Sequence, residues 1–367
     1  MRGVKNAVYT VLIILLCIFG LAKTSITSLA VSEALERCLT VIIPSLYAMM
    51  IISVLIAKSG IIHLFSVLSG FSSRVFGMEG EVFAVFVFSM LGGYPTGTKM
   101  LCEMSENGSI DRKRAELLSG LCYGAGPAFI FGCISGRLYG TAVAGKVILL
   151  SVLCANILVA LLISPLTRKS CKKLKGRSID ISMDILSESV ADSGRSMMSI
   201  CVAITAFSVI ISFLRYSGAV TLSGSIISFF TGKGQGISES IVSALLDVTA
   251  VGTFPENDFS LLPVLTALVS FGGICVIFQL KSIVSGKLSL KPLILTRIAV
   301  SLTSGAVCRL IAPLMLKGEI MRTSVEYGVK AEVYRSCSPV PSVMLIIMTA
   351  MFFSEYRKND GFSLLKK

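Results

Sequence analysis

Long apolar windows constrain this chain more than any other feature. Five of them are nearly free of charged side chains: Leu39–Ala57, Val147–Leu166, Met197–Leu214, Leu261–Leu280 and Leu293–Leu316. A helix rises about 1.5 Å per residue and the hydrocarbon core of a bilayer is about 30 Å thick, so these windows are long enough to cross it. Val8–Ala22 and Val340–Phe353 are shorter, but we expect them to span as well. The 367 residues, 54% hydrophobic and 15% charged, therefore predict an all-α integral membrane protein with several spans.

The basic residues behind the net charge of +13 fall in short loops rather than on one surface. The clusters are Arg2 and Lys5; Asp111–Arg114; Arg168–Arg177; Lys281, Lys287 and Lys291; and Arg357, Lys358, Lys366 and Lys367. Loops rich in lysine and arginine stay on the cytoplasmic side. We therefore expect both chain ends in the cytoplasm and an uncleaved first segment, the alternative being a cleaved signal peptide. No nucleic-acid partner is expected, because the basic residues do not cluster with exposed aromatic residues as they do on a nucleic-acid-binding surface.

The chain contains three pairs of similar segments in the same order, which predicts an internal duplication. The pairs are Ile51–Gly60 with Val209–Gly218, Gly124–Gly132 with Phe271–Gln279, and Leu161–Leu166 with Arg309–Leu314. The positions of the basic loops then predict that the two repeats have opposite orientations in the membrane. The predicted organisation is a transmembrane anchor (1–31), repeat 1 (32–166), a basic cytoplasmic linker (167–186), repeat 2 (187–315), and an external loop, last transmembrane helix and basic cytoplasmic tail (316–367).

The segment SMLGGYPTGTKM, Ser89–Met100, interrupts an apolar run with glycines and a proline. The run before it, Glu81–Leu91, is too short to cross a bilayer, so we predict a re-entrant hairpin that turns at this break. Ser243–Thr253 would be its mirror image in repeat 2, and Leu117–Ile134 a further span. The predicted total is about eight transmembrane helices and two re-entrant hairpins. The alternative is that the glycines form an ordinary turn at the membrane surface.

Irregular backbone inside a membrane is tolerated only where it is buried in protein or lines a wet cavity. The free helix ends at such breaks can bind charged solutes, so both breaks are candidate substrate sites. Asp247 lies within the second break in an apolar context, where an ionisable side chain indicates function. The alternative for Asp247 is a helix cap near the membrane interface.

Three motifs resemble one protein family, across roughly Ser32 to Leu314. They are GGYPTGTK (Gly92–Lys99), GAGPAFIFG (Gly124–Gly132) and SFGGICVIFQ (Ser270–Gln279). They resemble the sporulation integral membrane protein family with the nucleoside-recognition, or Gate, domain. The chain departs from the family pattern at Cys122, Tyr123 and Ala125, at Cys275–Phe278 and at Ala250.

The resemblance implies transport of a small organic anion, dipicolinic acid, during sporulation. The location it implies is a bacterial cytoplasmic membrane, in the mother cell or the outer forespore membrane. The predicted mechanism is alternating access, in which one repeat rocks against the other around the site.

The candidate substrate-binding residues come from the two breaks, the glycine motifs and two polar positions within spans. They are Gly92, Gly93, Tyr94, Pro95, Thr96, Gly97, Lys99, Gly126, Pro127, Asp247, Thr249, Gly272, Gly273, Gln279 and Arg297.

Each kind of side chain in this set has an expected role. Lys99, Arg297 and the hairpin helix ends would attract carboxylates, although both cations could instead extend to the lipid headgroups. Tyr94, Thr96, Thr249 and Gln279 would hydrogen-bond the solute, and Asp247 would carry a coupling proton or sodium ion.

No enzymatic motif is present. The sequence has one histidine, His63, and lacks HExxH, GxSxG, a Walker A loop and any CxxC pair. We predict no catalysis, no cofactor and no metal centre. Two alternatives to anion transport stay open. A nucleoside or nucleobase permease would need no cation in its cavity, and a non-transporting membrane scaffold would depend on the loop Arg168–Arg177.

Overall fold

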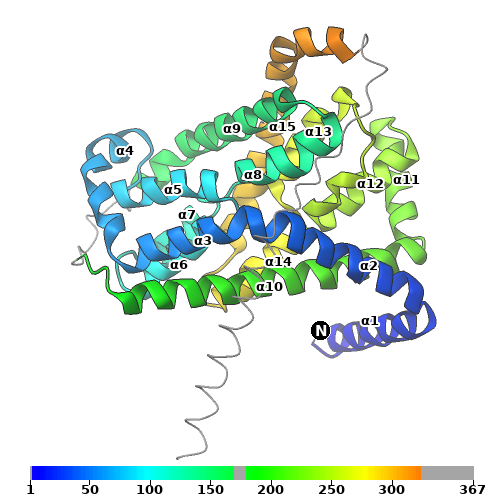
Figure 1. The fold of residues 1–367 in the computed structure, drawn as a ribbon, viewed down its shortest axis with the longest axis horizontal. Helices are drawn as coiled ribbons and strands as arrows, with labels where there is room; N and C mark the ends of the chain where they lie inside the picture. The colour runs from blue at the N-terminus through cyan, green and yellow to red at the C-terminus, as the bar shows by residue number, and fades with distance from the viewer. Residues whose placement is uncertain (1, 169–178, 324–367) are drawn as a thin grey trace, which may run out of the picture.

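The computed structural model describes residues 2–168 and 179–323, and this part of the chain is helical without β-strands (Figure 1). The α-helices are α1 (Arg2–Ala22), α2 (Thr24–Arg37), α3 (Ile43–Lys58), α4 (Ser69–Val75), α5 (Gly80–Gly92), α6 (Thr96–Glu106), α7 (Arg112–Ser119), α8 (Pro127–Phe129), α9 (Ala142–Arg168), α10 (Met183–Tyr216), α11 (Ala219–Thr231), α12 (Gln235–Leu246), α13 (Leu262–Phe271), α14 (Gly273–Val284) and α15 (Lys291–Thr323). Two π-helices, η1 (Cys38–Ile42) and η3 (Ile130–Tyr139), and three 3-10 helices, η2 (Ile61–Leu68), η4 (Val248–Thr253) and η5 (Phe259–Leu261), complete the described elements.

Five helical segments in the described residues are long and apolar enough to cross a bilayer. They are Thr24–Lys58, Ala142–Arg168, Met183–Tyr216, Phe259–Val284 and Lys291–Leu316. Each contains one of the five apolar windows of the sequence, so the prediction of an all-α, multi-pass membrane protein is confirmed. The pair Ile61–Val75 and Gly80–Gly92, bent by 90°, counts as a sixth crossing if it is taken as one span.

The predicted total of about eight spans is higher than these five or six described crossings. Leu117–Ile134 is not one helix, because α7 ends at Ser119 and no helix covers residues 120–126. The glycines in CYGAG (Cys122–Gly126) permit this break, and the sequence pattern did not reveal it. Val8–Ala22 lies in α1, a helix of 21 residues. Val340–Phe353 lies outside the described residues.

All four predicted domain boundaries fall within helices, and the one at 166/167 lies near the end of α9. α2, η1 and α3 run without interruption from Thr24 to Lys58, so the boundary at 31/32 cuts this segment. Likewise, α10 begins at Met183 rather than at 187, and α15 continues beyond 315 to Thr323. Charge and apolarity change gradually along these helices, and local composition therefore misplaces their ends by several residues.

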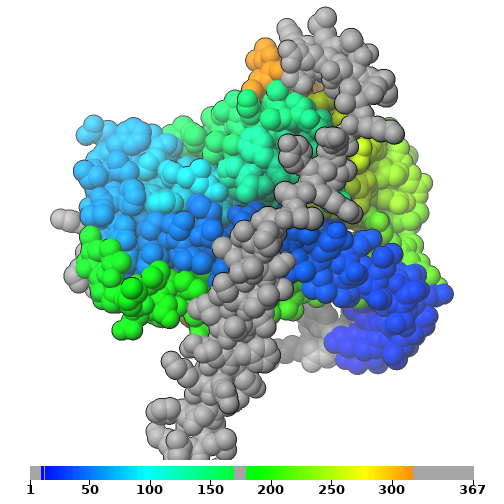
Figure 2. All heavy atoms as spheres, in the orientation of Figure 1, coloured from blue at the N-terminus to red at the C-terminus, as the bar shows by residue number. Residues whose placement is uncertain are grey.

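The Thr24–Lys58 segment and α10 lie side by side and antiparallel. The Lys58 ammonium at the end of α3 is 2.8 Å from the Glu188 carboxylate near the start of α10. At the other end, the Ser208 hydroxyl donates to the Ala30 carbonyl of α2 over 2.9 Å. Figure 1 shows both segments running along the molecule, with α4 and α5 at one end and α11 and α12 at the other. In the space-filling view, α10 lies below α3–α5 at the first of these ends (Figure 2).

Loops that are distant in the sequence meet at each end of the molecule. The α6–α7 and α14–α15 loops are joined by Lys287 and Glu106, 2.5 Å apart, and Arg112 donates to the Gly286 carbonyl over 3.4 Å. The hydrogen bond to Glu106 raises the pKa of the Lys287 ammonium above its ordinary value. The η4–η5 loop instead contacts the end of η3, because the Asn257 N–H donates to the Leu138 carbonyl over 2.8 Å. The two groups of loops are thus distinct.

Segments that are similar in sequence have similar local structure. Gly60 and Gly218, which end the first pair of segments, both follow a long helix and have φ of 77° and 76°. In the second pair, Gly126 precedes α8 as its N-cap and Gly272 precedes α14. In the third pair, a proline lies inside each long helix, Pro165 in α9 and Pro313 in α15. These three pairs of segments thus share local features of structure.

One arginine of the basic cluster Asp111–Arg114 is buried. Arg114 is 4% exposed and Glu79 is 3% exposed, and their bidentate pair has both N–O distances at 2.7 Å. The remaining donors of Arg114 reach the carbonyls of Thr167 and Gly77. This arginine therefore joins α7 to the turn before α5 and the end of α9, and it adds no free positive charge to the loop that the sequence assigned to the cytoplasm.

Arg114→Leu is expected to destabilise the protein by about 3–5 kcal/mol, since the buried Glu79 carboxylate loses its counter-charge. Arg112→Leu is the matched control on the same helix. Arg112 pairs with Glu116 at the surface, and such pairs contribute about 0–1 kcal/mol. The free energy of unfolding of both variants can be measured by titrating detergent-solubilised protein with SDS. Equal losses would contradict the role assigned to the buried pair.

Candidate functional site

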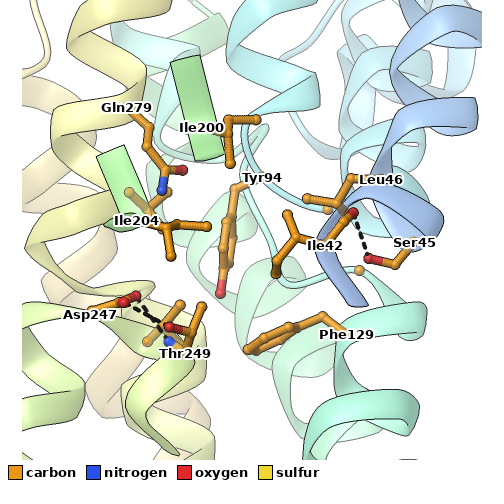
Figure 3. Close-up of a pocket in the computed structure, with 14 residues that line it drawn as sticks. Ile42, Ser45, Leu46, Tyr94, Phe129, Ile200, Ile204, Asp247, Thr249 and Gln279 are labelled. Atoms are coloured by element: carbon orange, nitrogen blue, oxygen red, sulfur yellow. Dashed lines mark hydrogen bonds between the residues drawn. The ribbon is translucent and has the colours of Figure 1, made fainter. Parts of the chain in front are cut away.

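A cavity lies where the two breaks of the chain meet. Its volume is about 30 Å³, which holds about two water molecules. Residues from both halves line it: Ile42, Ser45, Leu46, Gly93, Tyr94, Gly126 and Phe129 from the first, and Ile200, Ile204, Asp247, Val248, Thr249, Val276 and Gln279 from the second. Figure 3 shows most of these side chains around the space.

The first break depends on Gly93. α5 ends at Gly92, and Gly93 has φ 76° and ψ 171°, a region that is essentially restricted to glycine. A Cβ at Gly93 would lie 2.9 Å from the Gly126 backbone nitrogen. Conformation and close approach both exclude a side chain here, so the backbone of the first break packs directly against the segment before α8.

The second break is built around Asp247, which follows α12 in extended conformation. Its carboxylate accepts hydrogen bonds from the Thr249 N–H, over 3.0 Å, and from the Thr249 hydroxyl, over 2.6 Å. These bonds cap η4, as one of the two sequence interpretations predicted. The side chain is 2% exposed and lines the cavity, so Asp247 is both a cap and a wall of the site.

Tyr94 enters the cavity from the first break. Its ring stacks on Tyr123, with centroids 5.0 Å apart and planes inclined by 22°. The side chain is 9% exposed, and its hydroxyl has no hydrogen-bond partner in the described part of the chain. In Figure 3 this hydroxyl points toward the side of the cavity formed by Asp247 and Thr249. The hydroxyl of the first break thus faces the polar groups of the second break across the cavity.

Arg297 lies behind this stack and does not line the cavity. It is fully buried, and its guanidinium carbon is 4.8 Å from the centroid of the Tyr123 ring. Its nitrogens donate over 2.8–3.1 Å to the carbonyls of Gly120, Tyr123 and Ser270, to the Asn156 amide oxygen and to the Ser270 hydroxyl. The guanidinium therefore holds the ends of α7 and α13 together, and it does not reach the lipid headgroups.

Lys99 also points away from the cavity. It is 7% exposed, and its ammonium donates to the Asp192 carbonyl over 2.9 Å and to the Ser196 hydroxyl of α10. This contact joins α6, the helix after the first break, to α10 in the other half. The side chain neither reaches the headgroups nor lines the site in this conformation.

The structure thus divides the residues predicted from the sequence into two groups. Those that line the cavity are Gly93, Tyr94, Gly126, Asp247, Thr249 and Gln279. The others surround it or lie further away: Gly92, Pro95, Thr96, Gly97, Lys99, Pro127, Gly272, Gly273 and Arg297. Among these, Gly97 and Gly272 permit close packing, since a Cβ at either would lie 2.2 Å or less from an oxygen atom, of Cys122 or Tyr123 respectively.

Sequence reasoning missed the apolar walls of the cavity. Ile200 and Ile204 lie four residues apart on α10, and Ile42 and Leu46 have the same spacing across the start of α3. This spacing places each pair on one helix face. Every span of a membrane protein contains such pairs, so the sequence carries no signal that distinguishes these four residues from those that face lipid.

Comparison with known proteins adds no relative: no family model, curated protein or solved structure matches this chain.

Proposed function

We propose that this protein transports a small solute across the membrane by alternating access, with the cavity between the two breaks as its binding site. One observation carries the proposal: two interrupted helices from different halves of the chain meet at a partly polar cavity. Broken helices that meet near the middle of the membrane are the usual way in which transporters expose backbone and polar groups to a solute.

The proposal includes inverted repeats with two re-entrant hairpins. Each half has a long segment, Thr24–Lys58 or α10, followed by a short helix and a helix that ends at a break. The helices α5 and α12 lie toward opposite ends of the molecule (Figure 1), and the C-cap residue of each lines the cavity. The distinct loop groups at the two ends support this arrangement, and the basic residues of one group assign it to the cytoplasm.

Two classes of solute are candidates. Dipicolinate follows from the resemblance of the motifs, as does a role in sporulation. An uncharged nucleoside or nucleobase is favoured by a specific observation: neither Lys99 nor Arg297 lines the cavity, and the Lys99 ammonium and both terminal nitrogens of Arg297 donate hydrogen bonds elsewhere. A solute without negative charge needs no cation in its site.

Uptake of radiolabelled solutes into proteoliposomes that hold the purified full-length chain tests these candidates. We expect saturable uptake of one class, which excess unlabelled solute of the same class inhibits. Inhibition by dipicolinate alone identifies the anion, and inhibition by nucleosides alone identifies the uncharged class. Folded protein that takes up neither would contradict the proposed solutes and favour the scaffold. The scaffold's basic loop, Arg168–Arg177, lies outside the described residues except for Arg168.

A further inference from the structure

The cavity carries one acidic side chain without a paired positive charge. Asp247 is the lining carboxylate, and its described hydrogen bonds both come from Thr249. Arg37 of α2 acts on it through space, but forms no ion pair with it in the described residues, and its guanidinium donates to Ser208 over 3.5 Å. Buried charges in proteins are normally paired or bind a metal ion. The charge of this site is therefore unbalanced at short range.

The helix ends at the cavity make it more negative. α5 and α12, of 13 and 12 residues, both end here, and their C-caps, Gly93 and Asp247, line the space. The C-terminus of a helix carries a partial negative charge and free carbonyl oxygens. The helices that begin at lining residues after a break are short: α8 has three residues after its N-cap Gly126, and η4 has six after its N-cap Asp247. The C-termini of the longer helices α5 and α12, together with the carboxylate, outweigh them, so the site attracts positive charge.

A second oxygen faces the same space. The buried Tyr94 hydroxyl has no hydrogen-bond partner among the described residues, and it lies toward the side of the cavity formed by Asp247 and Thr249 (Figure 3). An unsatisfied buried hydroxyl is costly, which indicates a partner that the protein itself does not provide. Its oxygen can coordinate a hard cation together with carboxylate and carbonyl oxygens.

We propose that the cavity binds one monovalent metal cation of the size of Na⁺, between the Asp247 carboxylate and the Tyr94 hydroxyl. One carboxylate balances one positive charge, whereas Ca²⁺ would need six to eight oxygen ligands. The space of about 30 Å³ admits an ion of this size. This inference rests on the proposed transport function, in which the cation is the ion that couples transport to a gradient.

The cation can be tested by thermal unfolding of the purified full-length chain, without any transport assay. The chain has no tryptophan, but its buried free cysteines, among them Cys122 and Cys275, report unfolding through a thiol-reactive dye. Melting temperatures are compared in NaCl, KCl and choline chloride at equal ionic strength and pH. We expect NaCl to raise the melting temperature by several degrees in a saturable manner, and choline chloride to have no such effect.

Asp247→Asn should abolish the Na⁺-dependent shift, and Tyr94→Phe should weaken the apparent affinity roughly tenfold. Asp258→Asn is the matched control. Asp258 caps η5 with the geometry of Asp247, accepting from the Ser260 N–H over 3.0 Å and from the Ser260 hydroxyl over 2.6 Å, but it does not line the cavity. This variant should keep the full shift. If Asp247→Asn does not fold, Tyr94→Phe provides the same comparison.

The proposal is overturned if folded wild-type protein shows no Na⁺-specific shift, or if Asp247→Asn keeps it. A melting temperature that depends on pH but not on Na⁺ would identify a proton at Asp247 instead and would also overturn it. The uptake assay tests the transport function separately from the ion site. A Na⁺-dependent shift in melting temperature without uptake would refute transport but support the ion site. Uptake without such a shift would support transport but refute the ion site.

Discussion

Arg297→Leu is expected to destabilise the protein by about 3–5 kcal/mol, the loss typical of removing one partner from a buried charged network. The guanidinium is fully buried and bonded to three carbonyls, an amide oxygen and a hydroxyl. Leucine leaves these acceptors without donors and removes the cation from the Tyr123 ring. The loss is measured as a lower free energy of unfolding in SDS titration and a lower yield of monodisperse protein.

Arg309→Leu is the control for this prediction. Arg309 lies on the same helix, α15, but is exposed, so its replacement should change the stability by no more than about 0.5 kcal/mol. If Arg297→Leu folds as well as this control and only raises the KM for an anionic solute, Arg297 binds substrate. The structural role described here would then be wrong.

Gly93→Ala is expected to abolish transport and to cost several kcal/mol of stability. Placing a side chain at φ 76° and ψ 171° costs about 1–3 kcal/mol in backbone strain. Its Cβ also meets the Gly126 nitrogen at 2.9 Å, which forces the first break away from the segment before α8. Uptake per folded molecule and the melting temperature measure the two effects separately.

Gly108→Ala separates strain from contact. Gly108 also has positive φ, 72°, but no atom lies within 4 Å of its would-be Cβ, and it lies in the turn between α6 and α7, remote from the cavity lining. We expect a cost of about 1–2 kcal/mol and normal transport. Loss of uptake in both variants to the same extent would show that general destabilisation, and not the geometry of the break, stops transport.

The spans and the first break were predictable from the sequence because each depends on local chemistry. An apolar window of about 20 residues has few alternatives to crossing the bilayer. The segment Gly92–Gly97 combines residues that end a helix with the one residue type that tolerates the backbone angles at Gly93. The break at Cys122–Gly126 has the same origin, but its glycines lay within an apolar run and were taken for part of a span.

The contacts of the buried lysine and arginine side chains were not predictable from the sequence. Lys99, Arg114 and Arg297 are long cationic side chains in similar apolar contexts, yet their partners differ. Lys99 donates to α10, Arg114 pairs with Glu79, and Arg297 joins the ends of two helices. Each of these contacts links residues more than 30 positions apart. A long side chain can reach any of several helices. The helix that it contacts is decided by how the helices pack, and the residues next to it in the sequence do not specify that packing.

By itself, the sequence determined that the chain is helical, crosses the membrane several times and breaks at glycines, because water, lipid and backbone sterics act on each segment separately. Only the tertiary structure decided which groups meet at the two breaks. It brought Tyr94 and Asp247 to one cavity and buried Arg297 behind it. The balance of charge in a site depends on distances between helices, and a sequence specifies these only once the whole chain has packed.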